Sequence, residues 1–85
     1  MVFNDEIETL LNKALYYGAK GDFTKVIKYL KRVLQLNTDR FQIWDLLSKN
    51  YFLIGDYGQA GLCKAMADEL KNRDKKEKRS QQLYV

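Results

Sequence analysis

Apolar residues recur along this chain at spacings of three and four, which is the period of an α-helix with one buried face. The clearest case is the segment 22–36, in which an apolar stripe lies opposite a basic and polar face. The stripe consists of Phe23, Val26, Ile27, Leu30, Val33 and Leu34. The opposite face consists of Lys25, Lys28, Lys31, Arg32 and Gln35. This pattern predicts an amphipathic helix from Asp22 to about Leu36.

The segment before it has the same period. Asn4 is a good N-cap residue type, and the acidic residues that follow it suit the positive end of a helix dipole. We therefore expect a helix that starts near Asn4 and ends at Lys20-Gly21. Its apolar positions are Ile7, Leu10, Leu11, Ala14, Leu15 and Tyr17.

Two more helices are predicted in the second half of the chain. One opens at Asp39, with Gln42 three residues later as a variant of the capping box. Its main apolar stripe is Phe41, Trp44, Leu47, Tyr51 and Ile54, with Leu46, Phe52 and Leu53 off that stripe. The other starts at Asp56. It carries the small residues Ala60, Cys63 and Ala67 beside a larger stripe of Leu62, Met66 and Leu70.

A short motif occurs twice, once before each of two predicted helices. Residues 17–23 and 51–57 both read Tyr-x-x-x-Gly-Asp-aromatic, and corresponding positions stand 34 residues apart. A Gly after a helical run supplies the left-handed residue that ends it, and the Asp after it caps the next helix. Gly21-Asp22 and Gly55-Asp56 are therefore predicted to be tight corners. Each repeat should fold as an antiparallel helical hairpin.

A 34-residue helix-turn-helix period resembles that of the tetratricopeptide repeat family. In that register the second repeat matches the family pattern at Trp44, Leu47, Tyr51, Gly55, Asp56, Tyr57, Ala60 and Ala67. It departs from the pattern at Ser48, Lys64 and Asn72. The first repeat keeps size and polarity more than identity at Leu10, Ala14, Tyr17, Gly21, Asp22, Phe23, Val26, Leu30 and Val33, and departs at Lys13.

The resemblance implies an all-α fold of two tandem tetratricopeptide-like hairpins, a fragment of an α-solenoid, followed by a charged C-terminal tail. The two-repeat domain is expected to cover residues 1–72, with repeats at about 7–38 and 39–72. Residues 73–85 form a basic tail, either a helical extension or disordered. Repeat proteins usually need about three units to cover their apolar faces. Two units therefore suggest self-association, a partner or a larger parent protein.

In the family, the first helix of each repeat lines a concave groove. The corresponding positions here are Leu11, Leu15, Gly18, Ala19, Gln42, Asp45, Leu46, Lys49, Phe52 and Leu53. We expect a partner-binding groove with Leu11, Leu15, Leu46, Lys49, Phe52 and Leu53 as its main residues. Some family members bind the acidic tails of heat-shock chaperones through Lys, Asn and Arg. Leu11, Leu15 and Leu46 stand at those positions and cannot hold a carboxylate.

The amino-acid composition limits the kinds of catalytic or metal site that we expect in this chain. The chain has 85 residues, one cysteine and no histidine, so the commonest general base and metal ligand are missing. Cys63 is expected to be a packing residue rather than a reactive thiol. No nucleophile-base pair, phosphate loop or metal set can be assembled, so we expect no enzyme activity and no cofactor. With no long apolar run and no signal-peptide pattern at its start, the chain is expected to be cytoplasmic and without a membrane span.

Charge is concentrated near the end of the chain. Residues 1–70 hold nine basic and nine acidic residues, whereas residues 71–79 hold six basic and two acidic ones. We call residues 71–79 the basic run. The principal expectation is a non-catalytic protein-interaction module, a small adaptor or a scaffold, which pairs with itself through Leu62, Met66 and Leu70 or binds an apolar segment in its groove. The alternative is a nucleic-acid-associated protein that uses the basic run and the basic face of the second helix.

Overall fold

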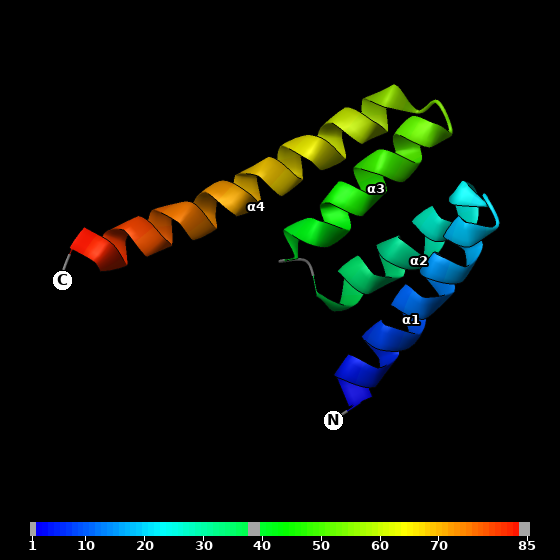
Figure 1. Ribbon diagram of the computed structural model, residues 1–85, viewed down its shortest axis with the longest axis horizontal. Coiled ribbons are helices and arrows are strands. Elements are labelled where there is room, and N and C mark those ends of the chain that lie inside the picture. The colour runs from blue at the N-terminus through cyan, green and yellow to red at the C-terminus, as the bar shows by residue number, and fades with distance from the viewer. Residues whose placement is uncertain (1, 38–39, 84–85) are drawn as a thin grey trace.

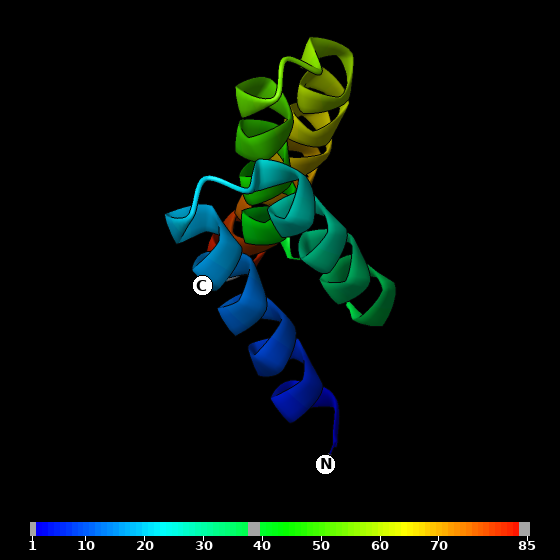
Figure 2. The same cartoon turned by 90° about the vertical axis from the view of Figure 1, so that its right-hand side faces the viewer.

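The fold is all-α. The computed structural model describes the backbone of residues 2–37 and 40–83 and the side chains of residues 5–37 and 40–73. Four helices cover these residues, in the order α1 (Val2–Ala19), α2 (Phe23–Leu36), α3 (Phe41–Leu53) and α4 (Tyr57–Leu83). α1 packs on α2 and α3 packs on α4, so the chain forms two antiparallel hairpins that join through α2 and α3 (Figure 1). In Figure 2, α1 and α3 lie on the left and α2 and the yellow start of α4 on the right, while the red end of α4 lies back toward the side of α1.

Both helix-to-helix corners have the geometry predicted from the repeated motif. Gly21 and Gly55 adopt positive φ values of 77° and 84°. Asp22 Oδ1 accepts a hydrogen bond from the Lys25 backbone N–H at 3.3 Å, and Asp56 Oδ1 accepts one from the Gln59 N–H at 3.2 Å. Each aspartate N–H donates back to a tyrosine carbonyl oxygen of the preceding helix at 2.9 Å. The two corners therefore end one helix and start the next with the same set of bonds.

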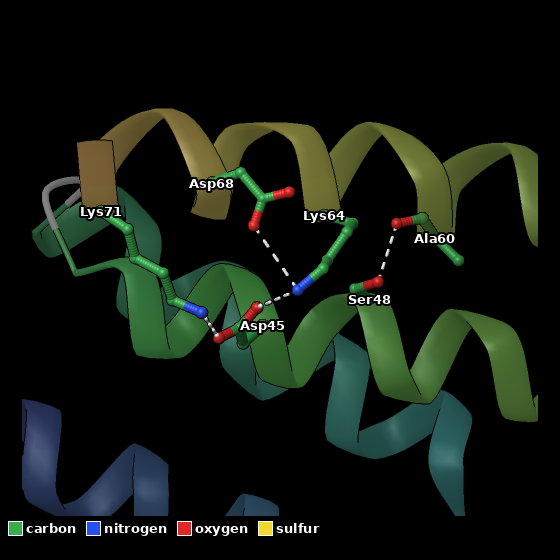
Figure 3. A network of polar contacts seen from close by, with 6 residues as sticks. All are labelled: Asp45, Ser48, Ala60, Lys64, Asp68 and Lys71. Atoms are coloured by element: carbon green, nitrogen blue, oxygen red, sulfur yellow. Dashed lines mark hydrogen bonds and ion pairs between the residues drawn. The ribbon is translucent and has the colours of Figure 1, made fainter. Parts of the chain in front are cut away.

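The core lies between the hairpins and within each of them. α2 contributes most to it: Leu30 and Val33 are almost fully enclosed, and the predicted stripe of α2 is confirmed, with Phe23 half-buried at its start. The small residues of α4 are buried as predicted. The Ser48 hydroxyl donates to the Ala60 carbonyl oxygen at 2.8 Å, so α3 and α4 approach closely where a large side chain would not fit (Figure 3).

Three predicted details differ in the structure. α1 begins at Val2, so Asn4 is a helical residue and not its N-cap; no glycine or proline precedes it to stop the helix. Ile54 is 45% exposed because it is the C-cap residue of α3, and Ile43, 3% exposed, is the core residue instead. Arg40 holds the N-cap position of α3 without a side-chain hydrogen bond, and the expected cap Asp39 lies outside the described residues.

Residues 73–83 are helical, where the sequence left two alternatives. α4 continues to Leu83 and extends well past the start of α3 (Figure 1). It therefore contains the whole basic run. Among the described residues, no helix is both long enough and apolar enough to cross a membrane.

Candidate functional site

An open apolar groove lies between α1 and α3, with α2 as its floor. Within residues 2–37 and 40–83, no Cα atom of α1 comes within 8 Å of one in α3, and this separation leaves the groove open. Its volume is about 260 Å³. It is lined by Leu11, Ala14, Leu15, Gly18, Ala19, Val26, Leu30, Leu46 and Asn50. The lining is almost wholly apolar, so the groove is suited to apolar side chains.

Several residues predicted for the groove meet there. Leu15 and Leu46 are 71% and 40% exposed, and Leu11 is half-buried beside them. These are large apolar side chains held at the surface on two different helices. The same three leucines also line a second hollow, of about 570 Å³, toward the start of α3, where Arg40 and Gln42 supply polar groups. The groove therefore has an apolar middle and one polar end.

The other predicted groove residues lie elsewhere on α3. Lys49, Phe52 and Leu53 line a separate hollow together with Ser48. The Phe52 ring packs edge-on against the Tyr57 ring of α4, with 5.1 Å between the ring centroids. Phe52 is still 61% exposed and Leu53 57% exposed. The predicted set of six residues thus divides between two apolar surfaces, one facing α1 and the other next to α4.

Asp45 was expected in the groove, and this expectation is wrong. Its carboxylate turns to α4, where Oδ2 lies 3.0 Å from Lys71 Nζ and Oδ1 lies 3.8 Å from Lys64 Nζ (Figure 3). Lys64 also lies 3.5 Å from an oxygen of Asp68. Ion pairs therefore connect α3 to α4 at two points. Lys64 contributes to this polar contact from α4.

Asn50 is a groove residue that the sequence reasoning missed. It is only 9% exposed, and its Nδ2 donates to the Leu46 carbonyl oxygen at 2.8 Å. Asn50 stands four positions after Leu46 and three after Leu47, so it lies on the same side of the helix as these two leucines. This spacing was the signal available in the sequence. Asn50 gives the apolar groove a polar group on its α3 side.

The proposed self-association surface is only partly exposed. Leu62 and Met66 are 66% and 40% exposed, whereas Leu70 is half-buried. Counting back 34 residues, Leu62 and Met66 correspond to Lys28 and Arg32. Both of these basic side chains are exposed although a second hairpin follows α2. Leu62 and Met66 therefore stand at outward positions that a following hairpin, packed in the same way, would leave uncovered.

Cys63 is buried beneath α3, with 4% of its surface exposed. Burial raises the pKa of its thiol, against a smaller opposing effect of the Lys31 charge. The reactive form of a cysteine is the thiolate, so both burial and the raised pKa reduce its reactivity. Within the described part of the chain, no three His, Cys, Asp or Glu side chains gather as a metal site would require.

Comparisons with protein-family models, with curated proteins and with solved structures give no match for this chain.

Proposed function

We propose that this chain is a non-catalytic protein-interaction module built from two tetratricopeptide-like hairpins, and that it binds an apolar segment of a protein partner in the groove between α1 and α3. The open apolar groove is the observation that carries this proposal. Helical or extended peptides bind such grooves by inserting apolar side chains at regular spacing. The equivalent corners, 34 residues apart, support the tetratricopeptide-like part of the proposal.

The chemistry of the groove favours an apolar anchor over an acidic one. Leu11, Leu15 and Leu46 surround the opening, and they offer no donor to a carboxylate. Polar groups stand at its margins: Asn50 on the α3 side and Arg40 at the far end. We therefore expect a partner segment with two or more apolar side chains and polar groups toward one end.

Selection of a displayed peptide library on the full chain tests this proposal. The selected peptides should share spaced apolar positions. Leu15→Asn and Leu46→Asn should each weaken binding of the best peptide by about tenfold or more, because both remove central apolar contacts. Leu62→Asn is the matched control, since Leu62 is a leucine of α4 outside the groove and is 66% exposed, against 71% for Leu15.

Circular dichroism of each variant checks that the fold is kept. Binding that survives both groove substitutions, or that Leu62→Asn reduces as strongly, would contradict the groove as the binding site. Peptides selected for acidic rather than apolar residues would contradict the proposed chemistry of the partner.

Self-association through α4 is a second candidate, and the exposure of Leu62 and Met66 favours it. Apolar residues at outward positions, where the first repeat has Lys28 and Arg32, are typical of a contact surface. Light scattering should show a mass that rises toward a dimer with protein concentration, in reductant to prevent a Cys63 cross-link. The double variant Leu62→Lys/Met66→Arg copies the first repeat and should stay monomeric. A wild-type chain that is monomeric at every concentration would rule this candidate out.

A further inference from the structure

Three tyrosine rings and four lysine side chains form a patch on the first hairpin, which we call the basic tyrosine face. Its rings are Tyr16, Tyr17 and Tyr29. The Tyr17 and Tyr29 rings stack, with centroids 5.7 Å apart and 7° between their planes, and Tyr16 meets Tyr17 edge-on at 5.2 Å. The patch therefore joins α1 to α2 through aromatic contacts.

Each of these rings has an ammonium group close to it. Lys20 Nζ lies 4.4 Å from the centroid of Tyr16, and Lys25 Nζ lies 4.7 Å from that of Tyr17. Tyr29 has two such neighbours, Lys13 at 5.7 Å and Lys28 at 6.0 Å. All four lysines are exposed, and Tyr16 is 54% exposed. The Tyr16 ring and four positive charges are thus displayed together at the surface, above the half-buried Tyr17 and Tyr29 rings.

We propose that the basic tyrosine face binds single-stranded nucleic acid. Proteins that bind single strands without sequence preference combine cations for the phosphates with aromatic rings on which bases stack. Tyr16 is the most exposed ring and is the stacking platform, while Lys20, Lys25 and Lys28 contact phosphates. A single strand is favoured over a duplex because its bases have free faces to stack on a ring.

This patch fits a nucleic acid better than the start of the basic run does. Lys71 is 3.0 Å from the Asp45 carboxylate, and Arg73 is 3.2 Å from Glu69, so both described cations of the run are already ion-paired. On the basic tyrosine face, Lys25 is the only one of the four lysines that is ion-paired with a described residue, at 3.8 Å from Asp22. On α1 the patch lies beside the groove: at about 100° per residue, Tyr16 stands about 100° around the helix from Leu15 and about 140° from Leu11. The two surfaces therefore share α1 but have no residue in common.

Fluorescence anisotropy of a labelled oligo-dT with the full chain tests the proposal. Tyr16→Ala should weaken binding by about tenfold through loss of one stacked base. Tyr57→Ala, at a comparably exposed tyrosine that packs on Phe52, should leave binding unchanged. Leu46→Asn, on the α3 side of the groove, should also leave it unchanged, which separates this site from the groove. No binding of oligo-dT, or equal effects of Tyr16→Ala and Tyr57→Ala, would overturn the proposal.

A salt series distinguishes the patch from the basic run. The logarithm of affinity falls with the logarithm of salt concentration, by about 0.7 for each phosphate neutralised on a single strand. Lys20→Gln/Lys28→Gln should therefore make the slope shallower by about 1.4. Lys75→Gln/Lys76→Gln, within the basic run, should leave the slope unchanged. The opposite result, or equal competition by a duplex of the same length, would assign binding to charge on α4 and overturn the proposal.

Discussion

At their corners the two hairpins are closely similar, whereas the outer faces of their second helices differ. Gly21 and Gly55 have the same left-handed conformation, and both following aspartates cap a helix. On the outer face, α2 carries Lys28 and Arg32 where α4 carries Leu62 and Met66. The 34-residue period is therefore kept at positions that fix the backbone. Exposed positions are free to differ, and they give each hairpin its own surface.

The interior of the two hairpins differs as well. Leu30, which is 1% exposed on α2, has Lys64 as its counterpart on α4, and the Lys64 side chain is 56% exposed. α2 is covered on two sides, by α1 and by α3, whereas α4 packs only on α3 among the described residues. One position of the repeat is therefore core in the first hairpin and surface in the second.

Substitution of the two corresponding residues, Leu30 and Lys64, should change stability to very different extents. Leu30→Ala should lower the free energy of unfolding by about 2–5 kcal/mol, because it leaves a cavity at the centre of the core. Lys64→Ala should cost less than about 1 kcal/mol, because its ion pairs lie near the surface. Urea unfolding followed by far-UV circular dichroism measures both. Equal losses would contradict the assignment of Leu30 to the core and Lys64 to the surface.

Substitution of the two corner glycines tests whether the corners are equivalent. Gly21→Ala and Gly55→Ala should each cost about 1–2 kcal/mol, because an L-residue with a side chain is strained at positive φ. No atom lies within 4 Å of the added methyl group at either position, so backbone strain is the whole cause. Gly61→Ala, inside α4 with similarly open space, should be neutral or stabilising. Thermal unfolding of the three variants compares them, and a clear difference between Gly21→Ala and Gly55→Ala would show that the corners are not equivalent.

The capping aspartates should give a somewhat smaller effect. Asp22→Ala and Asp56→Ala each remove one accepted backbone hydrogen bond at a helix start, worth about 1 kcal/mol. Asn keeps an accepting oxygen, so Asp22→Asn and Asp56→Asn should recover most of the loss. Urea unfolding curves of the four variants test this. If the asparagine variants were as unstable as the alanine ones, the caps would not act through this hydrogen bond.

The corners could be predicted from sequence because Gly and Asp act on their immediate neighbours in the chain. The groove could be predicted only in part. Leu11, Leu15 and Leu46 line the groove in the structure, whereas Asp45 and Phe52 do not, because their direction depends on how far α3 is rotated against α4. Helical period gives the spacing of a stripe and leaves open which side the partner helix covers.

Contacts between different helices were the hardest to predict. The stack of Tyr17 on Tyr29 depends on how α1 and α2 are aligned along their axes, because the two rings must lie at the same level. The sequence shows both tyrosines and all four neighbouring lysines, yet the helical pattern indicated only a packing residue at Tyr17. The packing role of Cys63 was easier to predict. Cys63 stands among small residues of one helix, and that local pattern already indicates close packing.

The ion pairs between α3 and α4 should contribute the least to stability. The first hairpin has an apolar residue, Leu11, at the position equivalent to Asp45. Asp45→Asn should lower stability by about 0.5–1 kcal/mol at low salt, since the carboxylate is 24% exposed and pairs with both Lys64 and Lys71. The loss should shrink at about 1 M salt, where the screening length is about 3 Å. Asp68→Asn is the control, because Asp68 is more exposed and pairs within its own helix. Urea unfolding at the two salt concentrations measures both variants. A loss for Asp45→Asn that does not change with salt would mean that this carboxylate stabilises the second hairpin by packing rather than by charge.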